Sequence, residues 1–381
     1  MDKIERYLNN LIDSSTPTSL VWNVENKTAS KKVSWNYIDG CMMNSILELS
    51  EITKNMKYFR FVCDYLYHFV DSKGNILGYD QQKFALDDIC SSRILFKMYD
   101  LTHDKRFLKA IENTYEQVKQ QPRTVEGNFW HKKIYPNQVW LDGFYMVMPF
   151  YTLYSNLYLK ADYTDIIAMY KLAERLMFNK EVGLYYHGYD AAKEIFWANK
   201  ETGLSKSFWL RAIGWFLCSI VDVYEYLHDV AAKEYFKDLF KKSITGILKY
   251  LDKPSYLFYQ VVDKGEEPGN YLETSGSAMV AYSILKGVRL EILDNEYQKI
   301  GQKIYDGITS RYFKCQDNLF TLGGICLVAG LGPANNLRRD GTYNYYISEP
   351  IVENESKGIA PFIMAYIELK KMQVKNNETR N

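Results

Sequence analysis

The chain has 381 residues, 47% of them hydrophobic, and its 47 basic side chains are balanced by 46 acidic ones, giving a net charge of +1. This composition is typical of a soluble globular protein with a large core. The near-neutral charge argues against a nucleic-acid partner, because neutralising phosphates requires an excess of basic side chains. No run of about 18 uninterrupted apolar residues occurs, so the sequence predicts no membrane span.

The first residues and the cysteines indicate the cellular compartment of the protein. Residues 1–19 are amphipathic and acidic rather than a basic stretch followed by an apolar one, so we expect no signal peptide. The six cysteines lie far apart without a CxxC pair, at positions 41, 63, 90, 218, 315 and 326. We therefore expect reduced core thiols in a cytoplasmic protein, not a disulfide or zinc framework.

Aromatic residues are abundant, with 33 Tyr, 19 Phe and 7 Trp. A bulky core is one interpretation. The other is a cleft lined with rings and hydroxyl groups, which suits sugars because their C–H faces lie on rings. Composition leaves both interpretations open.

A repeat runs through the helical pattern. Five times an apolar helix ends in a polar turn and a new helix opens with an aromatic residue, namely Tyr58, Phe107, Tyr163, Tyr235 and Tyr297. Each period has room for two helices of about 15 residues and their connections. A sixth apolar helix over 358–374 has no helix after it, and the amphipathic segment 2–12 lacks a partner. Pairing these two would close a ring of six hairpins.

This count predicts an all-α fold, an (α/α)6 barrel in which six inner helices are wrapped by six outer ones. We expect residues 1–381 to form one domain, because stacked repeats pack chiefly on their neighbours and no Pro/Gly/Ser-rich linker divides the chain. A two-domain helical protein is the weaker alternative. Residues 183–190 and 256–262 alternate enough to predict short strands in loops.

Polar and aromatic side chains gather ahead of the inner helices, in the segments 34–40, 84–89, 137–143, 207–215, 271–277 and 345–350. In a toroid of alternating helices, all inner N-termini lie at one end, and their dipoles point positive charge at it. The sequence therefore predicts a mouth rich in rings, carboxylates and one arginine, which is the expected binding site.

Asp142 stands alone in the apolar stretch "YPNQVWLDGFYMVMPF", flanked by Trp140 and Tyr145. Burying an unpaired carboxylate costs several kcal/mol, so such a group usually holds its proton. Capping or a turn is the alternative for Asp142. In "LDDI", Asp87 and Asp88 offer two acids, of which one can cap the helix while the other faces inward.

Arg211 lies between Trp209 and Trp215, where it either pairs with a buried acid or clamps a carboxylate ligand. His131 and His187 lie in loops among aromatic residues without the spacing of a metal site. We expect both to hydrogen-bond a substrate, and we expect no metal and no cofactor. Residues 330–336 form a loop, and no P-loop, GxSxG or dinucleotide fingerprint is present.

With these residues in hand, the chain resembles the unsaturated rhamnogalacturonyl hydrolases of glycoside hydrolase family 105, which are (α/α)6 barrels. The likeness runs almost end to end, through "WNYIDG", "LDDI", "GNFWHKKIYPNQVWLDGFYMVMPF", "YYHGYD", "FWLRAIGW", "YLETSGSAM" and "RRDGTYNYYISEPIVENESKGIAPF". The resemblance implies a small oligosaccharide substrate from pectin degradation. We expect a monomer or weak oligomer.

The resemblance also implies a reaction and its residues. The family removes the unsaturated uronic acid that pectin lyases leave at the non-reducing end, by hydrating a vinyl ether. Asp142 matches the general acid that protonates C4 and activates water, and Asp87 matches its partner carboxylate. Asp88 does not align and is left as a cap or structural acid. The residues matching the terminal-sugar subsite are Tyr37, His131, Trp140, His187 and Trp215, with Arg211 for the uronate carboxylate; Tyr345, Tyr346 and Glu349 would shape the following subsite.

Three other functions compete. An unsaturated glucuronyl hydrolase acting on glycosaminoglycans would have the same barrel and chemistry. A toroid sugar epimerase would need paired histidine bases, and only His131 and His187 are expected at the mouth. A non-catalytic carbohydrate-binding protein would use its acids as caps. Ile38 and Asp39 replace polar pairs of other kinds found in some relatives, which leaves the leaving-group sugar open.

Overall fold

The computed structural model describes residues 2–378, which fold mostly into helices. The longer helices are α1 (Lys3–Asp13), α3 (Tyr37–Thr53), α4 (Met56–Phe69), α6 (Arg93–Thr102), α7 (Lys105–Gln120), α8 (Asp142–Tyr158), α9 (Thr164–Met177), α10 (Leu210–Tyr226), α11 (Val230–Leu248), α12 (Thr274–Arg289), α13 (Glu296–Tyr312) and α15 (Ser356–Glu378). The short helices are α2 (Val24–Thr28), α5 (Leu86–Cys90) and α14 (Tyr343–Ile347), with single 3-10 turns at Gln81–Lys83 and Val262–Lys264.

Short strands pair two by two and antiparallel between the helices. The pairs are β1 (Gln138–Trp140) with β4 (Gly188–Asp190), β2 (Phe178–Asn179) with β3 (Leu184–Tyr185), β5 (Phe313–Gln316) with β6 (Leu319–Leu322), and β7 (Ile325–Cys326) with β8 (Ile351–Val352). These strand pairs lie within the loops between helices, and among residues 2–378 they form no larger sheet.

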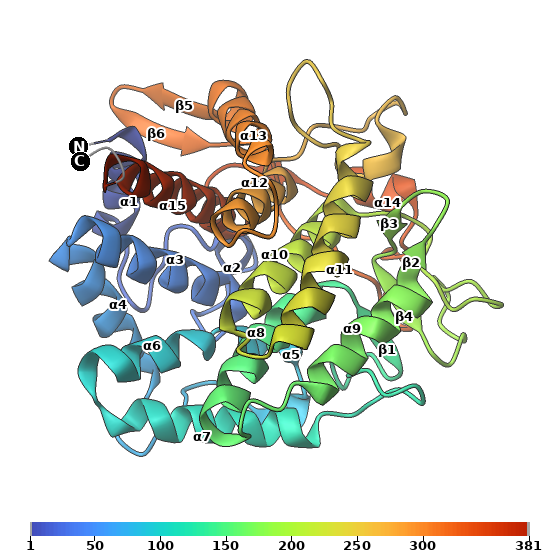
Figure 1. Ribbon diagram of the computed structural model, residues 1–381, viewed down its shortest axis with the longest axis horizontal. Helices are drawn as coiled ribbons and strands as arrows, with labels where there is room; N and C mark the ends of the chain where they lie inside the picture. Colours follow the sequence, from blue (N-terminus) through green and yellow to red (C-terminus); the bar gives the residue numbers. More distant parts are fainter. Residues whose placement is uncertain (1, 379–381) are drawn as a thin grey trace.

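The inner helices form a closed ring. Each of α3, α5 with α6, α8, α10, α12 and α15 packs against the next, and α15 returns to α3. Helices α4, α7, α9, α11 and α13 each pack outside the inner helix that precedes them, as Figure 1 shows for α11 beside α10. Inner helices carry apolar residues on all sides, with α12 buried from Thr274 to Val288, whereas outer α7 buries one face. The predicted (α/α)6 barrel is confirmed.

The two ends of the chain close the ring, as the unpaired first and last helices predicted. In Figure 1 both termini lie together beside α1 and α15. Glu5 on α1 accepts a hydrogen bond from the Tyr366 hydroxyl at 3.1 Å and pairs with Lys370 Nζ at 2.9 Å, both on α15. Helix α1 is therefore the sixth outer helix.

Two details of the predicted elements need correction. Residues 184–190 do form β3 and β4, but 256–262 make only isolated bridges at Leu257, Tyr259 and Val261, so the predicted strand there is wrong. The hairpin β5–β6 was not predicted. Its turn residues Asp317 and Asn318 have φ of 50° and 64°, the left-handed pair that suits a two-residue hairpin loop.

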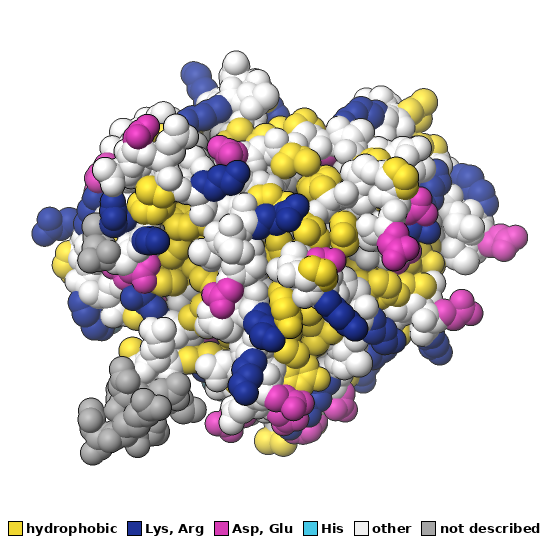
Figure 2. Space-filling model, turned by 90° about the horizontal axis from the view of Figure 1, so that it is seen from above, with side chains coloured by type: hydrophobic (Ala, Val, Ile, Leu, Met, Phe, Trp, Pro, Cys, Tyr) yellow, Lys and Arg dark blue, Asp and Glu magenta, His cyan; other side chains and the backbone are white. Residues whose placement is uncertain are grey.

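The prediction of reduced core thiols is only partly correct. All six cysteines are free, and four are buried, but Cys63 is half-buried and Cys315 is exposed, so the prediction of core thiols is wrong for those two. Basic and acidic side chains are interspersed on the face in Figure 2, as the near-zero net charge requires. No helix among residues 2–378 is both long and apolar enough to cross a bilayer.

Candidate active site

A cleft of about 250 Å³ opens at the N-terminal ends of the inner helices α3, α5 and α8. Five of the residues selected from the sequence line it together: Tyr37, Asp87, His131, Trp140 and Asp142. The remaining lining residues are Glu25, Asn26, Ser34, Asn36, Ile38, Asp88, Lys132, Tyr135, Met146, Val328, Ala329 and Arg339. Four carboxyl groups, those of Glu25, Asp87, Asp88 and Asp142, thus share one space with a histidine and several rings.

Asp142 is placed by the strand that precedes it. It is the first residue of α8 and follows β1 by one residue. In the β1–β4 ladder Trp140 lies opposite Gly188, and the Leu141 N–H donates to the His187 carbonyl at 2.8 Å. This ladder sets His187 beside Asp142.

The Asp142 side chain has a histidine as its ionic contact. Its Oδ2 atom lies 3.1 Å from Nε2 of His187, and the carboxyl is 13% exposed. Neither atom has an aligned hydrogen bond to a described residue, whereas Nδ1 of His187 lies 2.5 Å from the Tyr346 hydroxyl. Tyr346 therefore orients the imidazole. His187 is fully buried and lies behind Asp142, outside the lining of the cleft, so its contact with a substrate stays a prediction.

Asp87 stands in a different setting. Lys132 Nζ lies 2.5 Å from its Oδ2, and His131 Nε2 lies 3.4 Å from its Oδ1. Burial would raise the pKa of Asp87, but Lys132 and then His131 outweigh it and hold that pKa below its ordinary value. Burial lowers the pKa of His131 to about 4, against the pull of Asp87, so the imidazole is neutral at pH 7. Asp87 is consequently a permanent carboxylate near neutral pH.

Stacked rings form one wall of the cleft. Trp140 stacks on His131 and on Tyr135, with ring centroids 4.4 and 4.6 Å away, and the rings of His131 and Tyr135 lie 6.2 Å apart. Gly143 allows this packing, because a Cβ there would lie 3.1 Å from both His131 Nδ1 and Leu86 Cδ1. The wall is a flat apolar surface of the kind that packs against a sugar ring.

The acids at these helix starts are not caps. Helix α8 has no side-chain cap hydrogen bond, and neither has α5, which carries Asp87 and Asp88. The interpretation of Asp88 as a cap is therefore wrong. Burial and the neighbouring Asp87 raise the pKa of Asp88 to about 6, and its side chain lines the cleft.

Arg211 and Trp215 lie beneath the cleft rather than in its lining. The Arg211 guanidinium donates to Ser275 Oγ at 2.8 Å, bonds the Cys326 carbonyl and lies 3.6 Å from Glu273. Pairing with a buried acid, the alternative left open by the sequence, is thus present in the structure. A contact between Arg211 and a ligand carboxylate stays a prediction.

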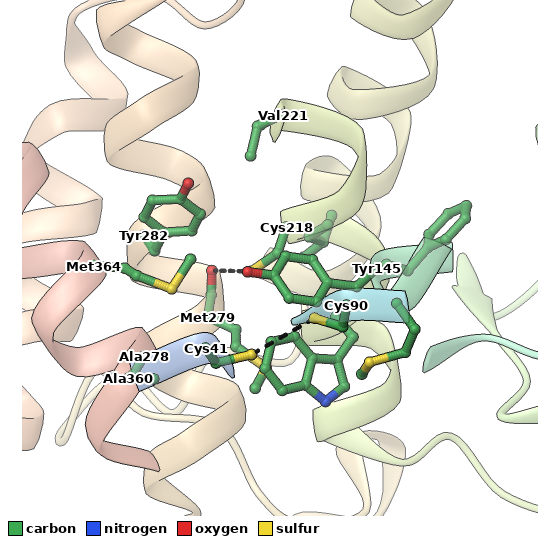
Figure 3. Close-up of a cluster of buried hydrophobic side chains, with 14 of the residues drawn as sticks. Cys41, Cys90, Tyr145, Cys218, Val221, Ala278, Met279, Tyr282, Ala360 and Met364 are labelled. Carbon is green, nitrogen blue, oxygen red and sulfur yellow. Dashed lines mark hydrogen bonds between the residues drawn. The ribbon is translucent and has the colours of Figure 1, made fainter. Parts of the chain in front are cut away.

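Rings and thiols continue below the cleft. Trp215 packs edge-on against Tyr37, with ring centroids 6.4 Å apart, and stacks on Tyr145 at 4.5 Å. In Figure 3, Tyr145 lies among Cys41, Cys90 and other buried side chains of the inner helices. This apolar packing supports Tyr37 from below and closes the floor of the cleft.

The three residues assigned to a following subsite are all buried and outside the lining. Tyr346 holds His187, Glu349 accepts from Arg338 at 2.9 Å, and the Tyr345 hydroxyl accepts from the Gly330 N–H at 2.9 Å. Their contact with a sugar stays a prediction. The sequence reasoning passed over Lys132, Tyr135, Glu25 and Arg339; the signals were a basic pair among aromatics in "WHKKIY" and a basic pair in the loop "RRDG".

The model of Glycosyl Hydrolase Family 88 matches residues 12–373, a span that contains every residue of the cleft. The chain belongs to this family. It is accordingly a glycoside hydrolase, and the cleft at the inner N-termini is its candidate active site. Among residues 2–378 no group of three or more His, Cys, Asp or Glu side chains is arranged to hold a metal.

Similar known proteins narrow the assignment within this group of glycoside hydrolases. A family 105 glycoside hydrolase from C. acetobutylicum is 35% identical, with a TM-score of 0.89 over 97% of this chain and 99% of that one. The resemblance to family 105 is thereby confirmed. The unsaturated rhamnogalacturonyl hydrolase YesR of Bacillus subtilis is 23% identical over 288 residues, 74% of this chain and 78% of that protein. An unsaturated glucuronyl hydrolase from Bacillus sp. GL1 shares the fold, with a TM-score of 0.67 at 15% identity over 97% and 95% of the two chains.

Proposed function

We propose that this hydrolase removes a 4,5-unsaturated galacturonyl residue from the non-reducing end of pectin-lyase products, such as the unsaturated rhamnogalacturonan disaccharide. The observation that carries the proposal is the unequal setting of two carboxyl groups in one cleft. Lys132 lies 2.5 Å from Asp87, whereas the ionic contact of Asp142 is a histidine at 3.1 Å. Two acids in such different settings divide the roles of proton donor and fixed negative charge.

In the proposed reaction Asp142 transfers its proton to C4 of the C4=C5 double bond, whose electrons form the new C–H bond. Positive charge develops at C5 and the ring oxygen, where the carboxylate of Asp87 stabilises it. Water then bonds to C5 and returns its proton to Asp142. The resulting hemiketal opens, and the neighbouring sugar leaves from C1. Asp142 ends the cycle protonated, and no glycosyl-enzyme forms.

His187 and the ring wall serve this chemistry by position. Because Tyr346 fixes one nitrogen of His187, its Nε2 atom faces Asp142 and positions that carboxyl group. Trp140 and Tyr37 would pack against the terminal ring, and His131, neutral at pH 7, bridges the ring wall to Asp87. The similarity to YesR, an unsaturated rhamnogalacturonyl hydrolase, supports the choice of a rhamnogalacturonyl substrate.

The test follows the ultraviolet absorbance of the conjugated double bond during incubation with unsaturated disaccharides. We expect the absorbance to fall with the unsaturated rhamnogalacturonan disaccharide, since hydration destroys the chromophore. An unsaturated chondroitin disaccharide is the comparison. Turnover of the chondroitin product alone would replace the proposed substrate by a glycosaminoglycan, and turnover of neither would refute the proposal.

Localisation and assembly follow from this proposal. An enzyme that finishes the breakdown of small unsaturated oligosaccharides fits the cytoplasmic location expected from its free cysteines, with no nucleic acid, membrane or cofactor as partner. We propose that it acts as a monomer or weak oligomer.

A further inference from the structure

One cation in the cleft has no partner within the described chain. Arg339 lines the cleft and is half-buried, yet its guanidinium makes no hydrogen bond or ion pair with any residue from 2 to 378. Three neighbouring cations are occupied: Lys132 by Asp87, Lys357 by Glu25 and Glu355, and Arg338 by Glu349. A half-buried guanidinium with five free donors is an available anion site.

The position of Arg339 is set by a glycine between it and the ring wall. A Cβ on Gly330 would lie 3.3 Å from Nη1 of Arg339 and 3.3 Å from the Trp140 indole. The guanidinium therefore lies close beside Trp140, whose ring also stacks on His131. Any side chain at position 330 would fill the space between the cation and the wall.

Arg339 comes from a different segment of the chain than the two acids. Asp87 and Asp142 lie in the first turns of inner helices, with side chains 16% and 13% exposed. Arg339 directly follows the exposed loop stretch 334–338. The cleft volume of about 250 Å³ is below the roughly 300–1,000 Å³ of common ligand pockets. Its inner end thus has room for a terminal sugar, and the rest of a substrate must extend past the loop.

We infer that Arg339 binds a carboxylate on the part of the substrate beyond the cleaved bond. The enzyme would then prefer unsaturated oligosaccharides whose second or third sugar is a uronate. A guanidinium suits a carboxylate because it donates two parallel hydrogen bonds. The inference rests on the proposed function and extends it to the leaving side of the substrate.

The test compares the parent with Arg339→Gln on three unsaturated galacturonyl substrates. One disaccharide carries neutral rhamnose as its second sugar, another carries galacturonate there, and a rhamnogalacturonan tetrasaccharide carries galacturonate third. We expect KM for at least one acidic substrate to rise about tenfold or more in Arg339→Gln, since hydrogen bonds to charged groups are the strong ones. KM for the neutral disaccharide should stay within about twofold of the parent value.

Lys31→Gln is the matched control. Burial raises the pKa of Glu25, and Lys357, Lys31 and Arg339 together bring it below its ordinary value, so Lys31 and Arg339 act on the same carboxylate. Lys31 is exposed and outside the cleft lining. If Lys31→Gln reproduces the change, a general field effect replaces the inference. An equal loss on all three substrates would place the terminal uronate on Arg339 and overturn it.

Calorimetry separates this inference from the proposed function. The same three oligosaccharides are titrated into the parent and into Arg339→Gln. If the parent consumes none of them, the proposed function fails, and the inference is judged on affinity alone. It then stands if the tighter binding of an acidic oligosaccharide disappears in Arg339→Gln, and falls if affinity is unchanged.

Discussion

Asp87 and Asp142 occupy one cleft but differ in their nearest charge. The ammonium of Lys132 lies 2.5 Å from Asp87, and the imidazole of His187 lies 3.1 Å from Asp142. Lys132 therefore keeps Asp87 ionised. The pKa of Lys132 shows the same coupling. Burial lowers this pKa, but the negative charge of Asp87 outweighs burial and raises the pKa above its ordinary value.

Removing this cation should change the pH dependence of catalysis. In the parent the folded-state pKa of Asp87 lies below its ordinary value, so the carboxylate is lost only as pH falls through that low value. In Lys132→Met, burial remains and raises the pKa of Asp87. We expect the acidic limb of the kcat/KM profile to move to higher pH by about 1–3 units. Lys132→Arg keeps a cation and should keep the parent limb; an unmoved limb in Lys132→Met would show that another group holds Asp87 ionised.

Sequence patterns located the residues whose position depends on a helix start. Tyr37, Asp87 and Asp142 lie in the first turns of inner helices, so the toroid alone brings them to one end. Arg211 also starts an inner helix, but its partners Ser275 and Glu273 come from α12 and its preceding loop, and no local pattern shows that pairing. Lys132 was missed because a basic pair in a loop is usually solvated.

The inner helices are joined at their far ends by buried charges. Asp222 on α10 contacts Arg93 of α6 at 2.5 Å and Lys286 of α12 at 2.6 Å, and it is fully buried. Arg289 of α12 contacts Glu368 of α15 at 2.5 Å. Two of these pairs join neighbouring inner helices, and the Arg93–Asp222 pair reaches past α8 from α6 to α10. These contacts therefore tie four inner helices together away from the active site.

Breaking this junction should destabilise the fold without altering the chemistry. Asp222→Asn takes the carboxylate from Arg93 and leaves Lys286 with Glu225 alone, at 2.7 Å, which should cost about 3–5 kcal/mol. Urea denaturation should report this loss, while activity per folded molecule persists, since Asp222 lies twelve residues, about 18 Å of helix, from the α10 N-terminus.

The surface pair Lys57–Asp13 provides the control for that measurement. Its side chains are 41% and 63% exposed, so Asp13→Asn should change the free energy of unfolding by less than about 1 kcal/mol. Equal effects of Asp222→Asn and Asp13→Asn would mean that the buried junction contributes nothing.

Helices were predictable where the hydrophobic pattern continued over several turns. The apolar helices and their aromatic-led partners follow from repeated spacing, because a helix face needs several turns to bury. The segment 256–262 failed because its alternation reflects single contacts, at Leu257 with Asp252 and at Tyr259 with Leu272, and not a continuous ladder. The β5–β6 hairpin depends on two turn residues in left-handed conformations, Asp317 and Asn318, which the scan for strands did not consider.

At the scale of the whole molecule, the barrel is closed by its two chain ends. Helix α1 buries Ile4, Tyr7, Leu8, Leu11 and Ile12 against the rest of the core. This closure was predictable because one helix at each end lacked a partner. The place of Arg339 in the cleft was not, since Gly330, beside which both Arg339 and Trp140 lie, is far from Trp140 in the sequence.

A cavity in this closing helix should loosen the entire ring. Leu8 is fully buried, so Leu8→Ala should lower the free energy of unfolding by about 2–5 kcal/mol. Asn10→Ala, at an exposed position of the same helix, should change it by less than about 0.5 kcal/mol. Both variants should keep parent activity well below their unfolding temperatures. A Leu8→Ala protein as stable as the parent would show that α1 is dispensable for closure.

The account depends most on proton donation by Asp142 to the substrate double bond. The direct measurement records double-bond absorbance and release of the neighbouring sugar together, for the parent and for Asp142→Asn with its fold checked by circular dichroism. We expect both signals to change at one rate in the parent and both to slow by about 10²–10⁴-fold in Asp142→Asn. Sugar release with the double bond intact, or parent-like rates in folded Asp142→Asn, would contradict the account.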